Sequence, residues 1–166
     1  MGLRERLVGR ADVKAAVTAA LGDARSGAGQ LMLIAGEAGI GKSAVLAFLA
    51  DAARDDCHLL RGFCLAGTGV PPYWPWIQVL RGSAAAAADL GEAGRLLDIT
   101  GDATDPGGAQ AAADARFRLH DAIGRVLATL AADRPVVVML DDLHWADEQS
   151  LAVLPFLTRA IAVDRC

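Results

Sequence analysis

Residues 36–43 have the spacing GxxxxGK(S/T), a pattern typical of loops that hold phosphate groups. Glycines in such a loop let backbone N–H groups turn toward phosphate oxygens, and a following helix directs the positive end of its dipole at them. The pattern predicts that Lys42 reaches the β and γ phosphates and that the Ser43 hydroxyl ligates Mg²⁺. The predicted ligands are therefore ATP and Mg²⁺, and the alternative is a strand-to-helix turn that matches by accident. The loop residues are Gly36, Glu37, Ala38, Gly39, Ile40, Gly41, Lys42 and Ser43.

A second group of candidate residues follows the apolar run 136–140, which ends in Asp141 and Asp142. An acid at the carboxyl end of a buried parallel strand lies at the ligand edge of the sheet, where it can hold the Mg²⁺ hydration shell. We expect this role for Asp141, with a helix cap or a solvated turn as the alternatives. Asp142 is expected to polarise the attacking water, or else to cap or hydrogen-bond locally.

The chemistry at Asp142 is expected to be slow. Aspartate is one methylene shorter than the glutamate of many efficient ATPases, so its reach to the water is reduced. His144 and Trp145 come next in the sequence, and we interpret both as packing residues.

These groups need a scaffold of strands and helices. The apolar run 31–35 predicts a strand buried on both faces, directly before the loop, and 136–140 predicts another. Residues 57–64 predict a further strand. Helices are predicted over about 11–21, 42–53 and 116–132, and a last helix is predicted to begin near Asp147, a good N-cap, with a kink at Pro155. The alternation indicates an α/β fold with a parallel sheet.

Two segments differ in composition. Residues 67–82 gather prolines and aromatic residues, which predicts a rigid turn leading into a short helix. Within it we expect Trp74 and Trp76 to be core anchors rather than a partner-binding surface. Residues 83–115 are rich in alanine, glycine and aspartate and predict weak helices around a flexible loop.

The composition limits the possible functions. The chain has 166 residues, enough for one domain, and its net charge of −4 gives no electrostatic footprint for nucleic acid. Three cysteines without CxxC spacing suggest neither a disulfide framework nor a zinc site. No apolar stretch of about 18 residues and no secretion signal is present, so we expect a cytoplasmic protein without a membrane partner.

The sequence Leu-Asp-Asp-Leu-His-Trp-Ala-Asp at 140–147 resembles the Walker B motif of AAA-type ATPase modules in large LuxR-family transcriptional regulators. These modules belong to the STAND class of signal-transduction ATPases. Residues 7–10, Leu-Val-Gly-Arg, are similar to the adenine-contact segment of that family, which would place Val8, Gly9 and Arg10 beside the adenine. The motif Pro-Tyr-Trp-Pro-Trp at 72–76 also recurs in many members. The resemblance covers essentially the whole chain.

The resemblance implies a P-loop NTPase fold of three αβα layers with a parallel sheet, incomplete because later strands and the lid are absent. Residues 1–166 would form a partial ATPase domain, the amino-terminal fragment of a longer protein and inactive alone. Its parts would be the phosphate loop 36–43, the Pro/Trp-rich segment 67–82, the Ala/Gly-rich insert 83–115 and Walker B at 136–142. The family places a later strand between the phosphate-loop strand and the Walker B strand, so both would lack their shared neighbour.

The implied function is that of a nucleotide-dependent switch with slow ATP hydrolysis. Its partners would be ATP and the missing carboxyl-terminal domains, with DNA bound only through those domains and with possible nucleotide-dependent self-association. Three alternatives are open: an AAA-type motor ATPase with brisk turnover, a module attached to an adenylate cyclase or kinase, and a degenerate scaffold that binds no nucleotide.

Overall fold

The computed structural model describes residues 11–83 and 109–163 of the chain. Five α-helices, two strands and one short 3₁₀ turn are described in these ranges. Their bounds are α1 Ala11–Arg25, α2 Lys42–Ala53, β1 His58–Phe63, α3 Trp74–Ser83, α5 Ala109–Ala131, β2 Val136–Asp141, the 3₁₀ turn Leu143–Trp145 and α6 Glu148–Val163. Residues 84–108, which are most of the predicted insert 83–115, lie outside the description, and so do the predicted adenine contacts Val8, Gly9 and Arg10.

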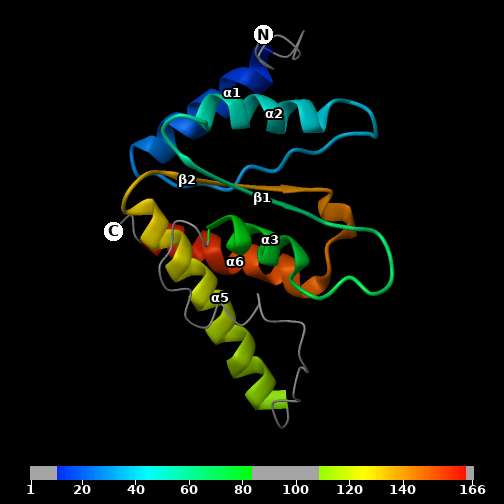
Figure 1. The fold of residues 1–166 in the computed structure, drawn as a ribbon. Coiled ribbons are helices and arrows are strands. Elements are labelled where there is room, and N and C mark those ends of the chain that lie inside the picture. Colours follow the sequence, from blue (N-terminus) through cyan, green and yellow to red (C-terminus); the bar gives the residue numbers. More distant parts are fainter. Residues whose placement is uncertain (1–10, 84–108, 164–166) are drawn as a thin grey trace.

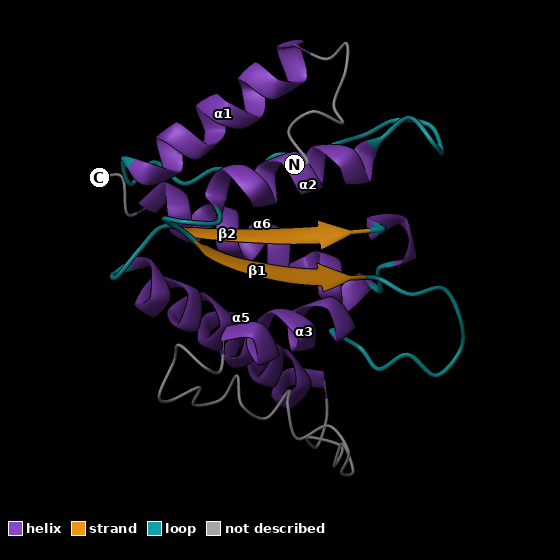
Figure 2. Cartoon of the chain, turned by 45° about the horizontal axis from the view of Figure 1, so that its top comes forward, coloured by secondary structure: helices purple, strands orange, loops and turns teal. Residues whose placement is uncertain are grey.

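The two strands form a parallel sheet, paired in register from His58 with Val136 to Phe63 with Asp141. Helices α1 and α2 lie on one face, and α3, α5 and α6 lie on the other (Figure 1). Both strands point the same way, so their carboxyl ends lie at the same edge of the sheet (Figure 2). This arrangement is a three-layer α/β fold around a two-stranded parallel sheet, and it confirms the predicted parallel sheet.

Apolar residues fill both faces of the sheet. The larger cluster is on the α3, α5 and α6 face, where Trp76, Ile77, Ile123 and Val153 are 1% exposed or less. On the other face Val17 of α1 packs against Val45 of α2. Burial of these side chains is the main force that holds the helices on the sheet, at about 1.5–3 kcal/mol for each large residue.

The predicted strand at 31–35 is wrong. These residues follow an extended course without the hydrogen-bond ladder of a strand, and Leu31 and Leu33 are 47% and 69% exposed, not buried on both faces. A strand requires a neighbour to bond to, and among the described residues nothing pairs with this segment. The sequence also predicts β2 as fully buried, but only Met139 of its residues is buried. The cause is again a missing neighbour, because β2 pairs with β1 alone among the described residues.

Most other predicted elements are confirmed, with changed ends. Helix α2 has the predicted bounds, β1 is shorter by one residue at each end, and β2 extends one residue to Asp141. Helix α1 continues to Arg25 and α5 begins at Ala109, because alanine favours helix on both sides of the apolar pattern. Helix α6 begins after its predicted cap: the backbone N–H of Ser150 donates to the Asp147 carboxylate at 2.9 Å.

The Pro/Trp-rich segment packs closely on the sheet. The Trp76 indole is 1% exposed and donates to the carbonyl of Ser150 at 2.9 Å, which confirms its predicted role as an anchor. Trp74 packs at the edge of the same cluster. Gly62 in β1 faces the start of α3, where an added Cβ would lie 2.3 Å from the carbonyl oxygen of Pro75. Glycine at position 62 therefore sets how closely α3 approaches the sheet.

Neither described range holds a helix with the length and apolar character needed to cross a bilayer.

Candidate nucleotide site

The loop 36–43 connects the extended segment to the first turn of α2. Gly39 has a φ of 75° and Gly41 a φ of 97°, values in the left-handed region that glycine adopts without strain. Helix α2 begins directly after Gly41, so its positive dipole end lies at the loop. The loop therefore joins an extended segment, not a strand, to a helix, and the predicted phosphate contacts depend on its turn into that helix.

The Lys42 ammonium group is held over the start of the loop. It donates to the carbonyl oxygens of Gly36 and Glu37, both at 2.9 Å. These two bonds hold the lysine side chain back along the loop, so that its positive charge lies beside the backbone of Gly36 and Glu37. A phosphate group bound there would meet this charge and the helix dipole together.

Ser43 and Asp141 face one another. The Ser43 hydroxyl lies 3.5 Å from Oδ2 of Asp141, although Ser43 lies in the first turn of α2 and Asp141 ends β2. The second carboxylate oxygen of Asp141 accepts the backbone N–H of Asp142 at 2.9 Å. That bond fixes the orientation of the carboxylate and leaves Oδ2 directed at Ser43.

Asp142 begins a tight turn at the end of β2. Its φ is 56° and its ψ is 39°, a left-handed conformation that aspartate tolerates better than most residues. Its carbonyl accepts the backbone N–H of Trp145 at 2.9 Å, which closes the 3₁₀ turn. The turn returns His144 toward Asp142, with Nδ1 of the imidazole 3.9 Å from the carboxylate Oδ1.

His144 and Trp145 were predicted to be packing residues, and this prediction is wrong. The His144 side chain is 63% exposed and Trp145 is 53% exposed. Their rings contact each other, with centroids 5.0 Å apart, but not the core. The 3₁₀ turn carries both outward from the end of β2. The sequence signal available was their position directly after two acids, which places them at the ligand edge of the sheet.

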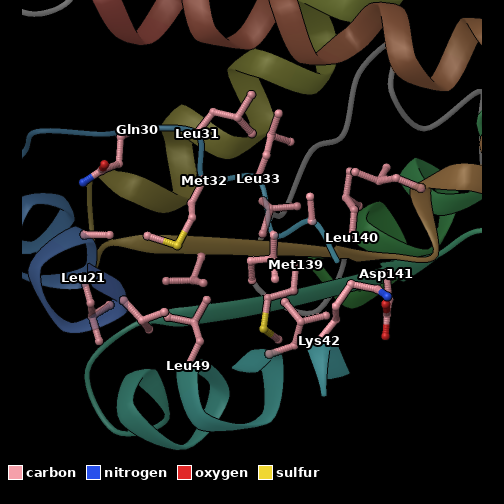
Figure 3. A pocket seen from close by; sticks show the side chains of 18 of the residues that line it. Leu21, Gln30, Leu31, Met32, Leu33, Lys42, Leu49, Met139, Leu140 and Asp141 are labelled. Carbon is pink, nitrogen blue, oxygen red and sulfur yellow. The ribbon is translucent and has the colours of Figure 1, made fainter. Parts of the chain in front are cut away.

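A cavity of about 790 Å³ lies between the extended segment and β2. Figure 3 shows Lys42 and Asp141 near one end and Leu21 near the other, with Leu31, Met32 and Leu33 along a wall. His144, Asp142 and Gly36 also line it. Most of its lining is apolar, and Lys42, Asp141 and Asp142 are the charged residues among it.

The oxygen atoms of the Ser43–Asp141 pair suit magnesium. Ser43 and Asp141 supply a hydroxyl and a carboxylate, the hard ligands that Mg²⁺ prefers. Within the described ranges no group of three or more histidine, cysteine, aspartate or glutamate side chains is arranged to hold a metal. Magnesium does not need one, because it is commonly bound by one or two protein oxygens together with phosphates and water.

Cys64 lies beneath the acidic end of the sheet. Its backbone N–H donates to the Asp141 carbonyl at 3.0 Å, and its side chain is 4% exposed. Burial raises the pKa of the Cys64 thiol, and the negative charges of Asp147, Asp142 and Asp141 raise it further. The thiol therefore stays protonated at neutral pH and adds no charge to the site.

The structure brings together the phosphate loop, Asp141 and Asp142 around one cavity, as the sequence predicts. Their roles toward nucleotide and metal stay predictions. The family model of the AAA ATPase domain matches residues 6–164 of the chain. Neither the curated proteins nor the solved structures include a significant match.

Proposed function

Because the chain belongs to the AAA ATPase domain family, we propose that it binds Mg-ATP at residues 36–43 and hydrolyses it slowly as a nucleotide-dependent switch. The observation that carries this proposal is the approach of Ser43 to Asp141 at the mouth of a cavity that Lys42 also lines. Lys42 and Ser43 at the start of α2 thus lie near Asp141 at the end of β2, which supports a shared site for a triphosphate and its metal.

Each residue has a separate role in the proposal. The loop N–H groups and Lys42 bind the phosphates, while Ser43 and Asp141 hold Mg²⁺, which neutralises charge on the phosphates when bound. Asp142 acts on the attacking water. Its short side chain and exposed position support slow turnover, because a general base must lie within hydrogen-bond reach of the proton that it takes.

The wider context in the proposal is a LuxR-family transcriptional regulator of the STAND class, in which this module is one part. The resemblance of residues 140–147 and 72–76 to that group supports it. The net charge of −4 agrees with a module that leaves DNA binding to other domains. In this proposal the nucleotide biases those domains, and the protein acts in the cytoplasm.

Nucleotide binding is tested by titrating the protein with a fluorescent ATP analogue. Lys42→Ala is expected to weaken binding by at least about 10-fold, since a charge-assisted contact to phosphate contributes about 1.5–3 kcal/mol. The chain offers one matched control, because Lys14 is its only other lysine. Lys14 lies on α1 above the Phe48 ring, and Lys14→Ala should bind normally. Equal affinity of wild type and Lys42→Ala would contradict the proposal and favour a degenerate scaffold.

Hydrolysis distinguishes a switch from a motor. Steady-state phosphate release by the wild type is expected to be well below about 1 s⁻¹, the lower end of the usual enzyme range. A rate at or above that value would favour a motor ATPase. The regulator context is tested by the reading frame downstream of codon 166: a helix-turn-helix there supports it, and a cyclase or kinase domain overturns it.

A further inference from the structure

We propose that Gln78 of α3 is a positioning residue for Asp141, the acid that holds Mg²⁺ in the proposed function. This inference rests on the proposed binding of Mg-ATP and adds a residue outside the phosphate loop on which the metal depends. It is carried by the peptide group that joins Phe63 to Cys64 at the end of β1. The Gln78 side chain bonds to the carbonyl of this peptide, and its N–H bonds to Asp141.

This peptide group lies between the two residues that it connects. Nε2 of Gln78 donates to the Phe63 carbonyl oxygen at 2.9 Å. On the opposite side, the backbone N–H of Cys64 donates to the Asp141 carbonyl oxygen at 3.0 Å. Because a trans peptide is planar, its C=O and N–H point in opposite directions and cannot rotate separately. The bond from Gln78 that fixes the carbonyl therefore also fixes the direction of the N–H toward Asp141.

The position of this peptide at the end of the sheet explains why it needs a second bond. Phe63 and Asp141 are the last pair in the register of the two strands. Since the N–H of Cys64 faces β2, the carbonyl of Phe63 points away from β2, and in the described ranges β1 has no second strand to supply a donor there. The ends of secondary-structure elements open most easily. Gln78 supplies the donor that a neighbouring strand would otherwise provide.

The Gln78 amide is itself held in one orientation. Its Nε2 also lies 3.3 Å from the carbonyl oxygen of Trp74, one turn earlier in α3. Both neighbours only accept hydrogen bonds, so the amide must present its NH₂ group to them rather than its oxygen. The helix is close at this point, because a Cβ on Gly62 would lie 2.3 Å from the Pro75 carbonyl oxygen. Helix α3 thus brings Gln78 to the end of β1.

Asp141 transmits this support to the metal position. Its carbonyl is held by the N–H of Cys64, and its Oδ1 accepts the N–H of Asp142 at 2.9 Å. The remaining oxygen, Oδ2, lies 3.5 Å from the Ser43 hydroxyl. Mg²⁺ demands near-ideal octahedral geometry with ligands at about 2.1 Å, so a small shift of Asp141 weakens its binding. Phosphates bound by the loop 36–43 do not depend on β1 in this way.

The test measures binding of the fluorescent ATP analogue at a series of Mg²⁺ concentrations. Gln78→Met keeps the length of the side chain and removes the donor. It should raise the Mg²⁺ concentration for half-maximal binding by about 3- to 10-fold, the equivalent of one hydrogen bond. In EDTA the variant should bind the analogue as the wild type does. Gln78→Lys, which keeps N–H donors on a side chain of similar reach, should restore most of the wild-type behaviour.

A matched control and a double variant complete the test. Gln110→Met removes a glutamine whose bond goes to Asp114 on the same helix, α5, and it should behave like the wild type. If Gln78 acts through Asp141, the Gln78→Met change should have no further effect on the Mg²⁺ dependence in an Asp141→Asn background.

Three results would overturn the inference and leave the proposed function intact. These are an unchanged Mg²⁺ dependence in Gln78→Met, an equal effect in the Asp141→Asn background, and similar losses of affinity in Mg²⁺ and in EDTA. The last result is that of a variant whose fold is loosened as a whole. Failure of the wild type to bind the analogue would instead overturn the proposed function.

Discussion

The Ser43 hydroxyl and the Asp141 carboxylate lie 3.5 Å apart, although 98 positions separate the two residues in the chain. Two independent elements place them: the first turn of α2 carries Ser43, and the end of β2 carries Asp141. The distance suits two ligands of one small cation.

The first prediction follows from this pair. Ser43→Ala and Asp141→Asn should each weaken binding of the ATP analogue in Mg²⁺ by about 10-fold, and the double variant should lose less than the sum, because both remove ligands of one ion. Titrations in Mg²⁺ and in EDTA measure the effect, which should vanish in EDTA. Asp55→Asn, on the exposed turn after α2, is the control for charge. Additive losses would indicate that the two residues do not share an ion.

The second prediction concerns the close approach of α3 to β1. Gly62→Ala places a methyl group 2.3 Å from the Pro75 carbonyl oxygen, a backbone atom that can move only with the helix. We expect a loss of about 1–3 kcal/mol in the free energy of unfolding, measured by urea denaturation. Gly82→Ala is the control, since the nearest atom to its Cβ is a Leu60 methyl group at 3.7 Å. Equal stability of the two variants would contradict the observed packing.

The third prediction tests the Trp76 anchor. Trp76→Phe removes the hydrogen bond to the Ser150 carbonyl and part of a side chain that is 1% exposed. Unfolding should become easier by about 2 kcal/mol, from a lost buried hydrogen bond and a small cavity. Trp145→Phe changes the same residue type at a 53% exposed position and should alter stability by less than about 0.5 kcal/mol. Similar losses of unfolding free energy in the two variants would show that Trp76 does not anchor the core.

The fourth prediction concerns pH. His120 is buried, contacts the Phe156 ring, and has Nε2 3.4 Å from the Tyr73 hydroxyl. Burial lowers its pKa below the ordinary value of 6.5, and the Arg116 charge lowers it further. The unfolded chain therefore binds a proton at a higher pH than the folded chain does. The neutral His120 side chain therefore contributes fully to the stability of the folded chain above about pH 6.5. This contribution declines as the pH falls below that value.

Urea denaturation at pH 7.5 and 5.5 checks this dependence. The wild type should lose more stability on acidification than His120→Phe, which has no titrating group at that position. The two proteins are identical at every other position, so the comparison isolates His120. An equal loss in both would show that His120 does not contribute.

The sequence predicted elements whose signals are local. The phosphate loop is specified by its glycine spacing, and α2 by the apolar periodicity that follows. The strand β2 and its terminal acids are specified by an apolar run that ends in Asp141 and Asp142. The strand at 31–35 failed because a strand depends on hydrogen bonds to a neighbour, which no property of its own residues supplies. Its apolar character appears instead in the cavity wall.

The relationships between side chains were the least predictable part of the site. Contact of His144 with Asp142 depends on a left-handed φ at one residue, and a two-residue offset in sequence does not reveal it. The same holds for Tyr73, which also has a positive φ and directs its hydroxyl to His120 across 47 positions. Backbone conformations of this kind are chosen by the surrounding fold rather than by the residue alone.

The conformation of Asp142 restricts which amino acids suit that position. A left-handed backbone is accessible to aspartate, asparagine and glycine, and it is less favourable for glutamate, whose longer side chain does not bond back to the local turn. The residue that best fits the turn is thus the carboxylate with the shorter reach. Under the proposed function, position 142 would therefore have to meet two requirements at once, the left-handed geometry of the turn and the reach of its carboxylate toward the water.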